Sequence, residues 1–422
     1  MSTRSLLLAP IGLLVSGLGV LYLKAHPVIG TVSPAMLLGL SYLPWLAAVI
    51  LFSILVQAIL IRRKLDIMLF PMALMLSSLG IIEIARLKPS LLIVQLRWLL
   101  LAMLLMLLVI RFSQVIQRIL AYPYILGLSC IVLLILPLII GTEIGGSRNW
   151  IVFGPISVQP SEFGKILIVF FLAAFLSDHR RVLSLPARQL LFLKLPPVRF
   201  IAPLIVIWGI AVLMFVVARD LGSALLFFGI ATTMTFMATG NKSYVFLSLI
   251  FVTAASIVSY KLFNHVRVRF DIWLNPWQDP NGMAYQIVQS LFSIGTGGIW
   301  GAGFGFGHPG FIPEVHTDFI FSAVAEELGL IATLMLMVIY ICLFWRGTMV
   351  ALSCRMEKDL LVVAGSSILL FMQAFIIIAG VTKFIPLTGI TLPFISYGGS
   401  SMLASFFILG TIISYTRRDA DG

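Results

Sequence analysis

Long apolar stretches follow one another along almost the whole chain, and few charged residues interrupt them. A helix that crosses a bilayer needs about 20 such residues in a row, so the stretches predict an all-α polytopic membrane protein. They are continuous and do not alternate every second residue, which excludes a transmembrane β-barrel. Only 10% of the 422 residues are charged, against about 25% in a soluble domain, so a soluble enzyme, a disordered chain and a coiled coil are excluded as well.

Twelve apolar stretches are candidates for membrane spans. They lie at residues 5–23, 35–61, 66–86, 90–110, 122–140, 160–177, 200–218, 221–239, 243–263, 318–345, 359–382 and 392–415. No small-residue cleavage site follows the first stretch, so we expect it to remain as a span and not to be removed as a signal peptide. An even number of spans places both termini on the same side of the membrane.

The positive charges indicate which side that is. Of the 28 Lys and Arg residues, 17 lie in loops on the side of the termini, nine lie in the opposite loops, and Arg97 and Lys165 lie within spans. Cytoplasmic loops are enriched in Lys and Arg, so both termini are predicted to be cytoplasmic. The net charge of +12 is spread over short loops without a long basic run, which argues against nucleic-acid binding.

Neither the cysteines nor the histidines of the large outside loop suggest a metal site. Cys130, Cys342 and Cys354 lie in or beside apolar spans without CxxC spacing, so we expect no disulfide framework and no zinc site. Three histidines share the loop, and their spacing matches no metal motif: His265, His308 and His316.

Two outside loops are substantial, at residues 141–159 and 264–316. The second mixes many glycines with Trp273, Trp277, Trp300 and several Phe. This mixture is typical neither of a flexible linker nor of a soluble domain, so we expect backbone packed close to the bilayer surface with aromatic rings at headgroup depth. The alternative is a loop without function that turns alone hold in place.

Charged side chains at membrane depth are costly unless they face a partner or water, so they are functional candidates. Arg148 lies in the first outside loop, and Glu162 and Lys165 follow it in the sequence QPSEFGK. Pro160 favours a helix start, which places Glu162 in the first turn and Lys165 on the same face. Either the pair merely neutralises itself, or Arg148 and Lys165 face an anionic substrate group while Glu162 holds Lys165 in place.

Two further groups are predicted on the same face of the membrane. Arg219 and Asp220 form an adjacent pair in a short hairpin, which is either an interfacial turn or part of the site. Asp318 enters a long apolar helix at its N-terminus, where the helix dipole favours an ionised carboxylate, although an ordinary cap is the alternative. Ser322 and Glu326 continue its stripe every four residues, a pattern that a lipid-facing helix would not tolerate.

Two more features belong to the end of the chain. Glu326 and Glu327 are expected to make buried structural hydrogen bonds. Pro393, Gly398 and Gly399 predict a broken helix at the start of the final span, and irregular backbone at that depth must line a cavity or pack within protein. Close packing of small residues between helices is the alternative interpretation.

These groups, in this order, resemble the SEDS family (shape, elongation, division and sporulation), whose members include FtsW, RodA and SpoVE. The resemblance covers about residues 66 to 416. The matching motifs are GSRNWI, QPSEFGK, DLGSA, YQIVQSLFSIGTGGIWGAGFG, PEVHTDFIFSAVAEELG and PLTGITLPFISYGGSS. The resemblance implies a family core at residues 65–418, with the large extracellular loop at 264–316. It also implies that residues 1–64 form two transmembrane helices that the common ten-span core lacks.

The resemblance implies a peptidoglycan glycosyltransferase of the bacterial cytoplasmic membrane, which polymerises lipid II at the outer face for division, elongation or sporulation. It implies a class B penicillin-binding protein as the partner transpeptidase. The family's essential aspartate falls on Asp318, which is therefore the catalytic candidate. The candidates for substrate binding are Arg148, Glu162, Lys165, Arg219, Asp220, Gln289, Thr317 and Ser396.

Two single positions depart from the usual family pattern. Ala218 and Arg219 stand before DLG where Gln-Pro or Lys-Pro is usual, and Ile378 stands where many members carry Asn. These departures weaken any role assigned to those positions and do not affect Asp318.

The expected mechanism is inverting transfer. A sugar hydroxyl is a poor nucleophile, so Asp318 would take its proton while the hydroxyl attacks the anomeric carbon of the lipid-linked donor. Arg148, Lys165 and Arg219, or an unassigned divalent cation, would stabilise the departing pyrophosphate, and an apolar groove would hold the polyprenyl tail. No other cofactor is expected.

Two alternatives belong to other functional classes. A lipid flippase or transporter would suit the intramembrane charges and broken helices, but the polar groups cluster toward the outside and no inverted repeat is visible. A non-catalytic scaffold of the cell-wall synthesis complex would keep the fold without turnover.

Overall fold

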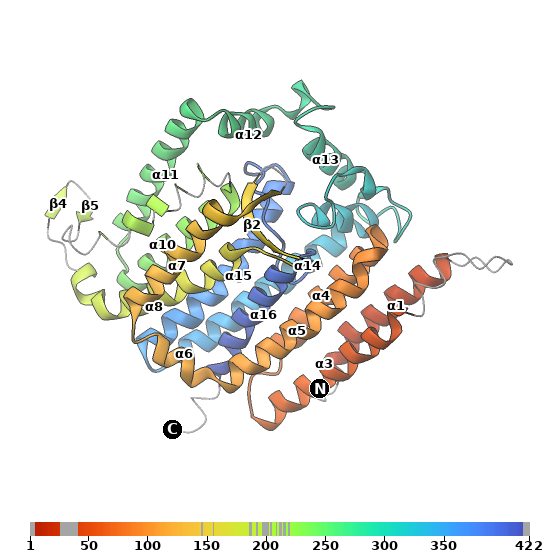
Figure 1. Ribbon diagram of the computed structural model, residues 1–422, viewed down its shortest axis with the longest axis horizontal. Helices are drawn as coiled ribbons and strands as arrows, with labels where there is room; N and C mark the ends of the chain where they lie inside the picture. Colours follow the sequence, from red (N-terminus) through yellow and green to blue (C-terminus); the bar gives the residue numbers. More distant parts are fainter. Residues whose placement is uncertain are drawn as a thin grey trace. The chain divides into compact units, whose positions relative to one another are not determined.

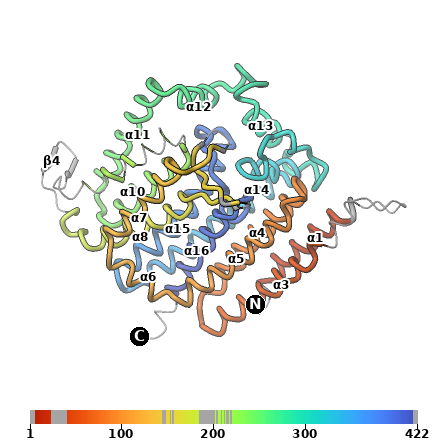
Figure 2. The backbone as a smooth tube through the Cα atoms, viewed as in Figure 1, coloured from red at the N-terminus to blue at the C-terminus, as the bar shows by residue number. Residues whose placement is uncertain are grey.

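The computed structural model describes most of the chain (Figures 1 and 2). The chain divides into two compact units. The first unit comprises Met1–Arg111, Tyr285–Arg346 and Thr391–Gly422, and the second comprises Phe112–Ala284 and Gly347–Ile390. The described residues are 5–25, 41–144, 147–154, 156–184, 188–190, 193–195, 202, 205–207, 209–210, 213, 217 and 220–416.

The first unit is built from long apolar helices and one irregular loop. Its elements are η1 (Ser5–Leu7), α1 (Leu8–Ala25), α3 (Leu43–Arg62), α4 (Leu69–Leu87), η2 (Pro89–Leu91), α5 (Leu92–Arg111), α13 (Tyr285–Gly297), η4 (Pro309–Phe311), most of α14 (Ile320–Ser353) and α16 (Gly399–Ser414). Helix α16 packs along α5, α1 along α4 and α3 along α5, as Figure 1 shows. A Cβ on Gly399 would collide with the ring of Trp98, so the small residue lets the two helices approach closely.

The second unit packs α8 among three other helices. Its elements are α6 (Ser113–Ile119), α7 (Pro123–Ile140), β1 (Thr142–Ile144), β2 (Ser147–Phe153), β3 (Ile156–Val158), α8 (Pro160–Ser184), β4 (Arg188–Leu190), β5 (Leu193–Leu195), α10 (Leu221–Thr239), α11 (Ser243–Leu262), α12 (Asn264–Leu274), η3 (Pro276–Gln278) and α15 (Glu357–Val381). Helices α7, α10 and α15 each pack along α8, and this packing buries most of its apolar side chains.

Nine of the described helices are long and apolar enough to span a membrane, and two shorter apolar helices, Leu8–Tyr22 and Gly399–Ser414, accompany them. The polytopic helical prediction is confirmed at this level. The predicted span at 200–218 lies largely outside the described residues, so the count of twelve stays a prediction. The predicted stretch 35–61 corresponds to α3, which is described from Leu43.

The prediction of an all-α chain was wrong for the first outside loop. Strands β1, β2 and β3 form an antiparallel sheet there, with Trp150 opposite Thr142 and Val152 opposite Ser157. Strand pairing joins residues on separate strands, so the backbone hydrogen bonds of this polar loop are satisfied without a helix.

Two predicted helix boundaries also moved. Helix α14 extends to Ser353 and bends at Gly329, whose φ of 77° is outside the helical region. The final helix begins at Gly399 and not at 392, because Phe394 has a φ of 68° and Gly398 a φ of 160°. The predicted break before the last helix is therefore confirmed.

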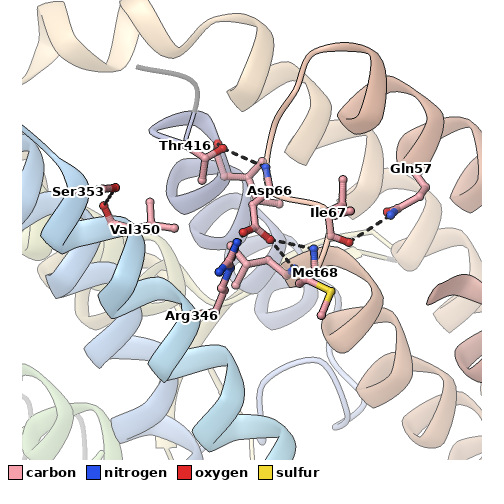
Figure 3. Close-up of polar contacts among 10 residues, drawn as sticks. Gln57, Asp66, Ile67, Met68, Arg346, Val350, Ser353 and Thr416 are labelled. Atoms are coloured by element: carbon pink, nitrogen blue, oxygen red, sulfur yellow. Dashed lines mark hydrogen bonds and ion pairs between the residues drawn. The ribbon is translucent and has the colours of Figure 1, made fainter. Parts of the chain in front are cut away.

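One end of the first unit is fastened by Asp66, as Figure 3 shows. Its Oδ1 accepts hydrogen bonds from the backbone N–H groups of Met68 at 2.8 Å and Leu69 at 3.0 Å, where α4 begins. Its Oδ2 pairs with Nε of Arg346 at 2.5 Å, and its own N–H donates to Oγ1 of Thr416 at 3.1 Å. The buried carboxylate of Asp66 thus joins α4 to α14, and its backbone N–H joins the same turn to the end of α16.

Candidate functional site

Asp318 lies in the turn that leads into α14, two residues before the helix begins. Its side chain is half-buried, while Phe319 and Ile320 beside it are buried. The irregular segment before α16 supports this turn. Oγ of Ser396 donates to the carbonyl of Thr317 at 2.5 Å, and the N–H of Tyr397 donates to the carbonyl of His316 at 2.9 Å. The structure therefore brings Thr317 and Ser396 together beside Asp318.

Gln289 lies on α13, half-buried. The next residue, Ser290, is fully buried, and its Oγ lies 2.7 Å from Oγ of Ser322 in the first turn of α14. This contact fastens α13 to the beginning of the helix that Asp318 precedes. The prediction that Ser322 and Glu326 face protein and not lipid is confirmed, because both are buried.

Glu162 and Lys165 form an ion pair in the second unit. Nζ of Lys165 lies 2.7 Å from Oε1 of Glu162 and donates to Oε1 of Gln373 at 2.9 Å. Both charged side chains are almost completely buried, with exposures of 2% for Lys165 and 5% for Glu162. The predicted shared face is confirmed. The geometry is that of a self-neutralised pair, so a substrate role for Lys165 stays a prediction.

Asp220 caps the N-terminus of α10. Its Oδ1 accepts the N–H of Ser223 at 2.9 Å, and its Oδ2 accepts the Ser223 hydroxyl at 2.7 Å and Nδ2 of Asn149 at 2.9 Å. Burial raises the pKa of the Asp220 carboxyl, against the opposing effect of the Ser223 hydrogen bonds and the charges of Arg269 and Lys165. Arg219 lies outside the described residues.

Arg148 is exposed on β2, next to the buried Asn149. Its Nε donates to the carbonyl of Gly141 at 3.0 Å, where α7 ends. A guanidinium at a helix C-terminus satisfies one of the unpaired carbonyls there and leaves its remaining N–H groups for an anion. The strand pairing of β2 sets this position, which the sequence pattern alone did not reveal.

The candidate residues thus fall into two groups by unit. Sequence reasoning missed Asn149, Gln373 and Arg269; the last donates to the carbonyl of Leu387 at 3.1 Å. Gln373 left one usable signal, a lone amide in the middle of an apolar span. In the described part of the chain, no three His, Cys, Asp or Glu side chains gather where they could hold a metal ion.

An apolar cavity of about 260 Å³ lies within the second unit. It is lined by α7, α8, α10 and described residues of the segment at 206–210, and its walls include Leu134, Phe171 and Phe227. Almost all of its lining is hydrocarbon. Such a site can take a lipid chain but offers nothing to a charged ligand.

Comparisons with known proteins give a consistent result. Residues 47–420 match the family model FtsW/RodA/SpoVE, described as "Cell cycle protein". The chain is 38% identical over 361 residues to the peptidoglycan glycosyltransferase RodA of Mycobacterium bovis, covering 82% of this chain and 77% of that protein. It is 37% identical over 294 residues to stage V sporulation protein E of Bacillus subtilis, covering 68% of this chain and 77% of that protein.

Solved structures agree with these relatives. A chain from a structure entitled "Structural coordination of polymerization and crosslinking by a peptidoglycan synthase complex" matches with a TM-score of 0.65 and 28% identity, over 85% of this chain and 99% of that one. The rod shape determining protein RodA of Thermus thermophilus matches with a TM-score of 0.61 and 26% identity, over 85% of this chain and 98% of that one.

Proposed function

Because the chain belongs to the FtsW/RodA/SpoVE family, we propose that it polymerises lipid II with Asp318 as the general base. It is a multi-pass membrane protein and a peptidoglycan glycosyltransferase. The alternatives of a lipid flippase and a non-catalytic scaffold are not favoured, since its relatives carry the name of the transferase.

The position of Asp318 is the observation that carries the proposal. A half-buried carboxylate at the start of α14 can stay ionised and still reach a substrate. Ser396 and Tyr397 hydrogen-bond to the backbone just before Asp318, so the main chain that carries this carboxylate is held in place. In the reaction it accepts the proton of the acceptor hydroxyl, which attacks the anomeric carbon of the donor as the bond to the undecaprenyl pyrophosphate breaks.

Arg148 and Lys165 are proposed to stabilise the charge of the leaving pyrophosphate. Arg148 is exposed and retains donors beyond its bond to Gly141, so it is the stronger candidate for direct contact. Lys165 is buried between Glu162 and Gln373, so its positive charge is proposed to act on the pyrophosphate at a distance and not through a direct hydrogen bond. The apolar cavity beside Phe171 is proposed to take part of the polyprenyl chain.

Contacts at the two ends of α4 support the proposed topology. At its beginning, Asp66 contacts Arg346 and Thr416. All three residues lie in or beside loops that are predicted to be cytoplasmic from their Lys and Arg content. At its other end, Arg86 contacts Gly307 in the loop predicted to lie outside. A helix of 19 residues is about 28 Å long, close to the thickness of the hydrocarbon core. These contacts favour cytoplasmic termini and an outer position for Asp318.

The partner is proposed to be a class B penicillin-binding protein. The solved complex that resembles this chain couples polymerisation and crosslinking, as its title states. A transpeptidase uses the glycan strands that a polymerase makes, so the two activities suit one assembly.

The test is glycan synthesis by the purified protein with lipid II, with and without the partner. Asp318→Ala should lower the polymerisation rate by about 10²- to 10⁴-fold while the protein still folds. Glu314→Gln is the matched control, because Glu314 is an exposed carboxylate in the same turn and should keep normal activity. Near-normal polymer from Asp318→Ala would remove Asp318 from its role, and lipid translocation without polymer would indicate a flippase.

A further inference from the structure

A glycine-rich loop at residues 298–308, called the glycine loop below, supports the bend of α14. At Gly329 the helix leaves helical geometry, so backbone groups on both sides of it lose their partners within the helix. The loop supplies them: the N–H groups of Ala302 and Gly303 donate to the carbonyls of Glu326 and Glu327 at 2.8 and 3.1 Å. In return, the N–H of Leu330 donates to the carbonyl of Gly298 at 3.0 Å.

Side chains fasten the same loop a second time. Oε2 of Glu327 accepts the N–H of Gly305 at 2.7 Å, and Oε1 of Glu326 accepts the N–H of His308 at 2.6 Å. Both glutamates are buried, which confirms the prediction of structural hydrogen bonds for this pair. A Cβ on Gly301 would collide with the carbonyl of Glu327, so the loop approaches the helix as closely as backbone allows.

Arg86 at the end of α4 holds both partners at once. Its terminal nitrogen Nη2 donates to the carbonyl of Gly307 at 2.8 Å and lies 2.9 Å from Oε1 of Glu327. The carboxylate of Glu327 is fully buried, so this guanidinium is what makes its charge tolerable there. One side chain therefore ties three separate parts of the unit together: α4, the glycine loop and the bend of α14.

We propose that Arg86 is a positioning residue for Asp318, acting through Glu327 and the glycine loop. The segment of α14 between the bend and Asp318 is short, and Glu327 stands at its far end. At its near end Ser322 meets Ser290 of α13, which leads directly into the glycine loop. The loop and the segment thus form one closed unit whose position Arg86 sets, and the carboxylate of Asp318 moves with it. This inference rests on the proposed role of Asp318 as the base.

Glu83 is a second buried carboxyl group near Arg86. It lies three residues before Arg86 on α4, is completely buried, and neither of its oxygens has a hydrogen-bond partner among the described residues. It is also close enough to Arg86 and Glu327 for their charges to act on it. Glu83 and Glu327 thus place two buried carboxyl groups near one guanidinium, so loss of Arg86 would take this neighbouring charge from both.

The experiment compares Arg86→Gln, Asp318→Ala and the double variant in detergent, with initial rates at varied lipid II. Arg86→Gln should lower kcat by about 10- to 100-fold and leave KM nearly unchanged, because a displaced base slows the chemical step without removing a substrate contact. Adding Arg86→Gln to Asp318→Ala should cause no further loss, since the displaced group is already absent. Arg118→Gln, an exposed arginine on α6, is the control and should behave as wild type.

The outcomes separate the two proposals. If Asp318→Ala is inactive and Arg86→Gln has normal kcat, the positioning role is wrong and the base assignment stands. If Asp318→Ala is active, the base assignment fails first. A further loss of rate in the double variant would mean that Arg86 acts independently of Asp318, which also contradicts the inference. Should Arg86→Gln not fold, Arg86→Lys keeps the charge beside Glu327 and should show a smaller loss of kcat, whereas a normal kcat would overturn the proposal.

Discussion

The hydroxyl of Ser396 lies 2.5 Å from the carbonyl of Thr317, so a residue in the irregular segment before α16 holds the backbone beside Asp318. The same hydroxyl oxygen accepts the N–H of Leu392 at 2.9 Å. Ser396 is buried, and the segment around it has no regular secondary structure to fix its place. The bond to Thr317 therefore joins the segment to the turn, next to the bond from Tyr397 to His316, while the bond from Leu392 holds the segment itself.

Replacing Ser396 by Ala should lower both stability and activity. Each lost buried hydrogen bond costs about 1 kcal/mol, and the turn that carries Asp318 loses one of its two backbone anchors. Thermal unfolding in detergent and initial rates of glycan synthesis measure the two effects. Ser414→Ala is the matched control, since within the described part of the chain its hydroxyl bonds the carbonyl of Thr411 in its own helix and no other segment. Equal behaviour of the two variants would contradict a supporting role for Ser396.

Gln373 should matter for the same reason in the second unit. Its Oε1 accepts a hydrogen bond from the buried Lys165, so Gln373→Leu removes an acceptor from this ammonium and leaves it paired with Glu162. A buried charged donor without its acceptor costs about 1–3 kcal/mol, so we expect the free energy of unfolding to fall by that amount and the unfolding temperature to fall with it. Gln373→Glu restores an acceptor but adds a second carboxylate, and should fall between Leu and wild type. A Leu variant as stable as wild type would show that the amide contributes nothing.

Spacing along one helix predicted the parts of the site that a single helix determines. Glu162 and Lys165 are three residues apart, and their pairing follows from helical geometry alone. The place of Asp318 before a helix likewise follows from where the apolar run begins. Such features need no knowledge of other segments, so the sequence pattern was sufficient for them.

Contacts between distant segments were not accessible in that way. Arg86 reaches Gly307 across 221 residues, and Lys165 reaches Gln373 across 208. The bend at Gly329 depends on backbone donors from the glycine loop, which no hydrophobic period records. The sheet in the first outside loop was missed for the same reason, because its strands are short and their hydrogen bonds lie between strands.

Asp220 should contribute to stability through its cap and its network. Asp220→Ala removes the acceptor for the first turn of α10 and leaves Asn149 and Ser223 without it, so the cost should exceed the usual 1 kcal/mol or so of a lost cap. Asp220→Asn keeps an acceptor for the N–H of Ser223 but opposes one amide to another at Asn149, so its cost should be intermediate. Unfolding temperatures of both variants test this order. A harmless Ala variant would show that the buried network is not needed.

His316 should make the protein less stable in mild acid. Burial lowers the pKa of its imidazole below the ordinary value, and the nearby Glu314 opposes this only in part. In the unfolded chain the imidazole takes up a proton near pH 6.5, whereas in the folded chain it does so only at a lower pH. The free energy of unfolding therefore falls as the pH drops from the unfolded pKa toward the folded one. Unfolding temperatures between pH 7.5 and about 5.5 should fall more steeply for wild type than for His316→Phe, which keeps a ring beside Tyr397. His308→Gln, an exposed histidine of the same loop, should follow wild type. Parallel curves for wild type and His316→Phe would show that the buried imidazole does not set this pH dependence.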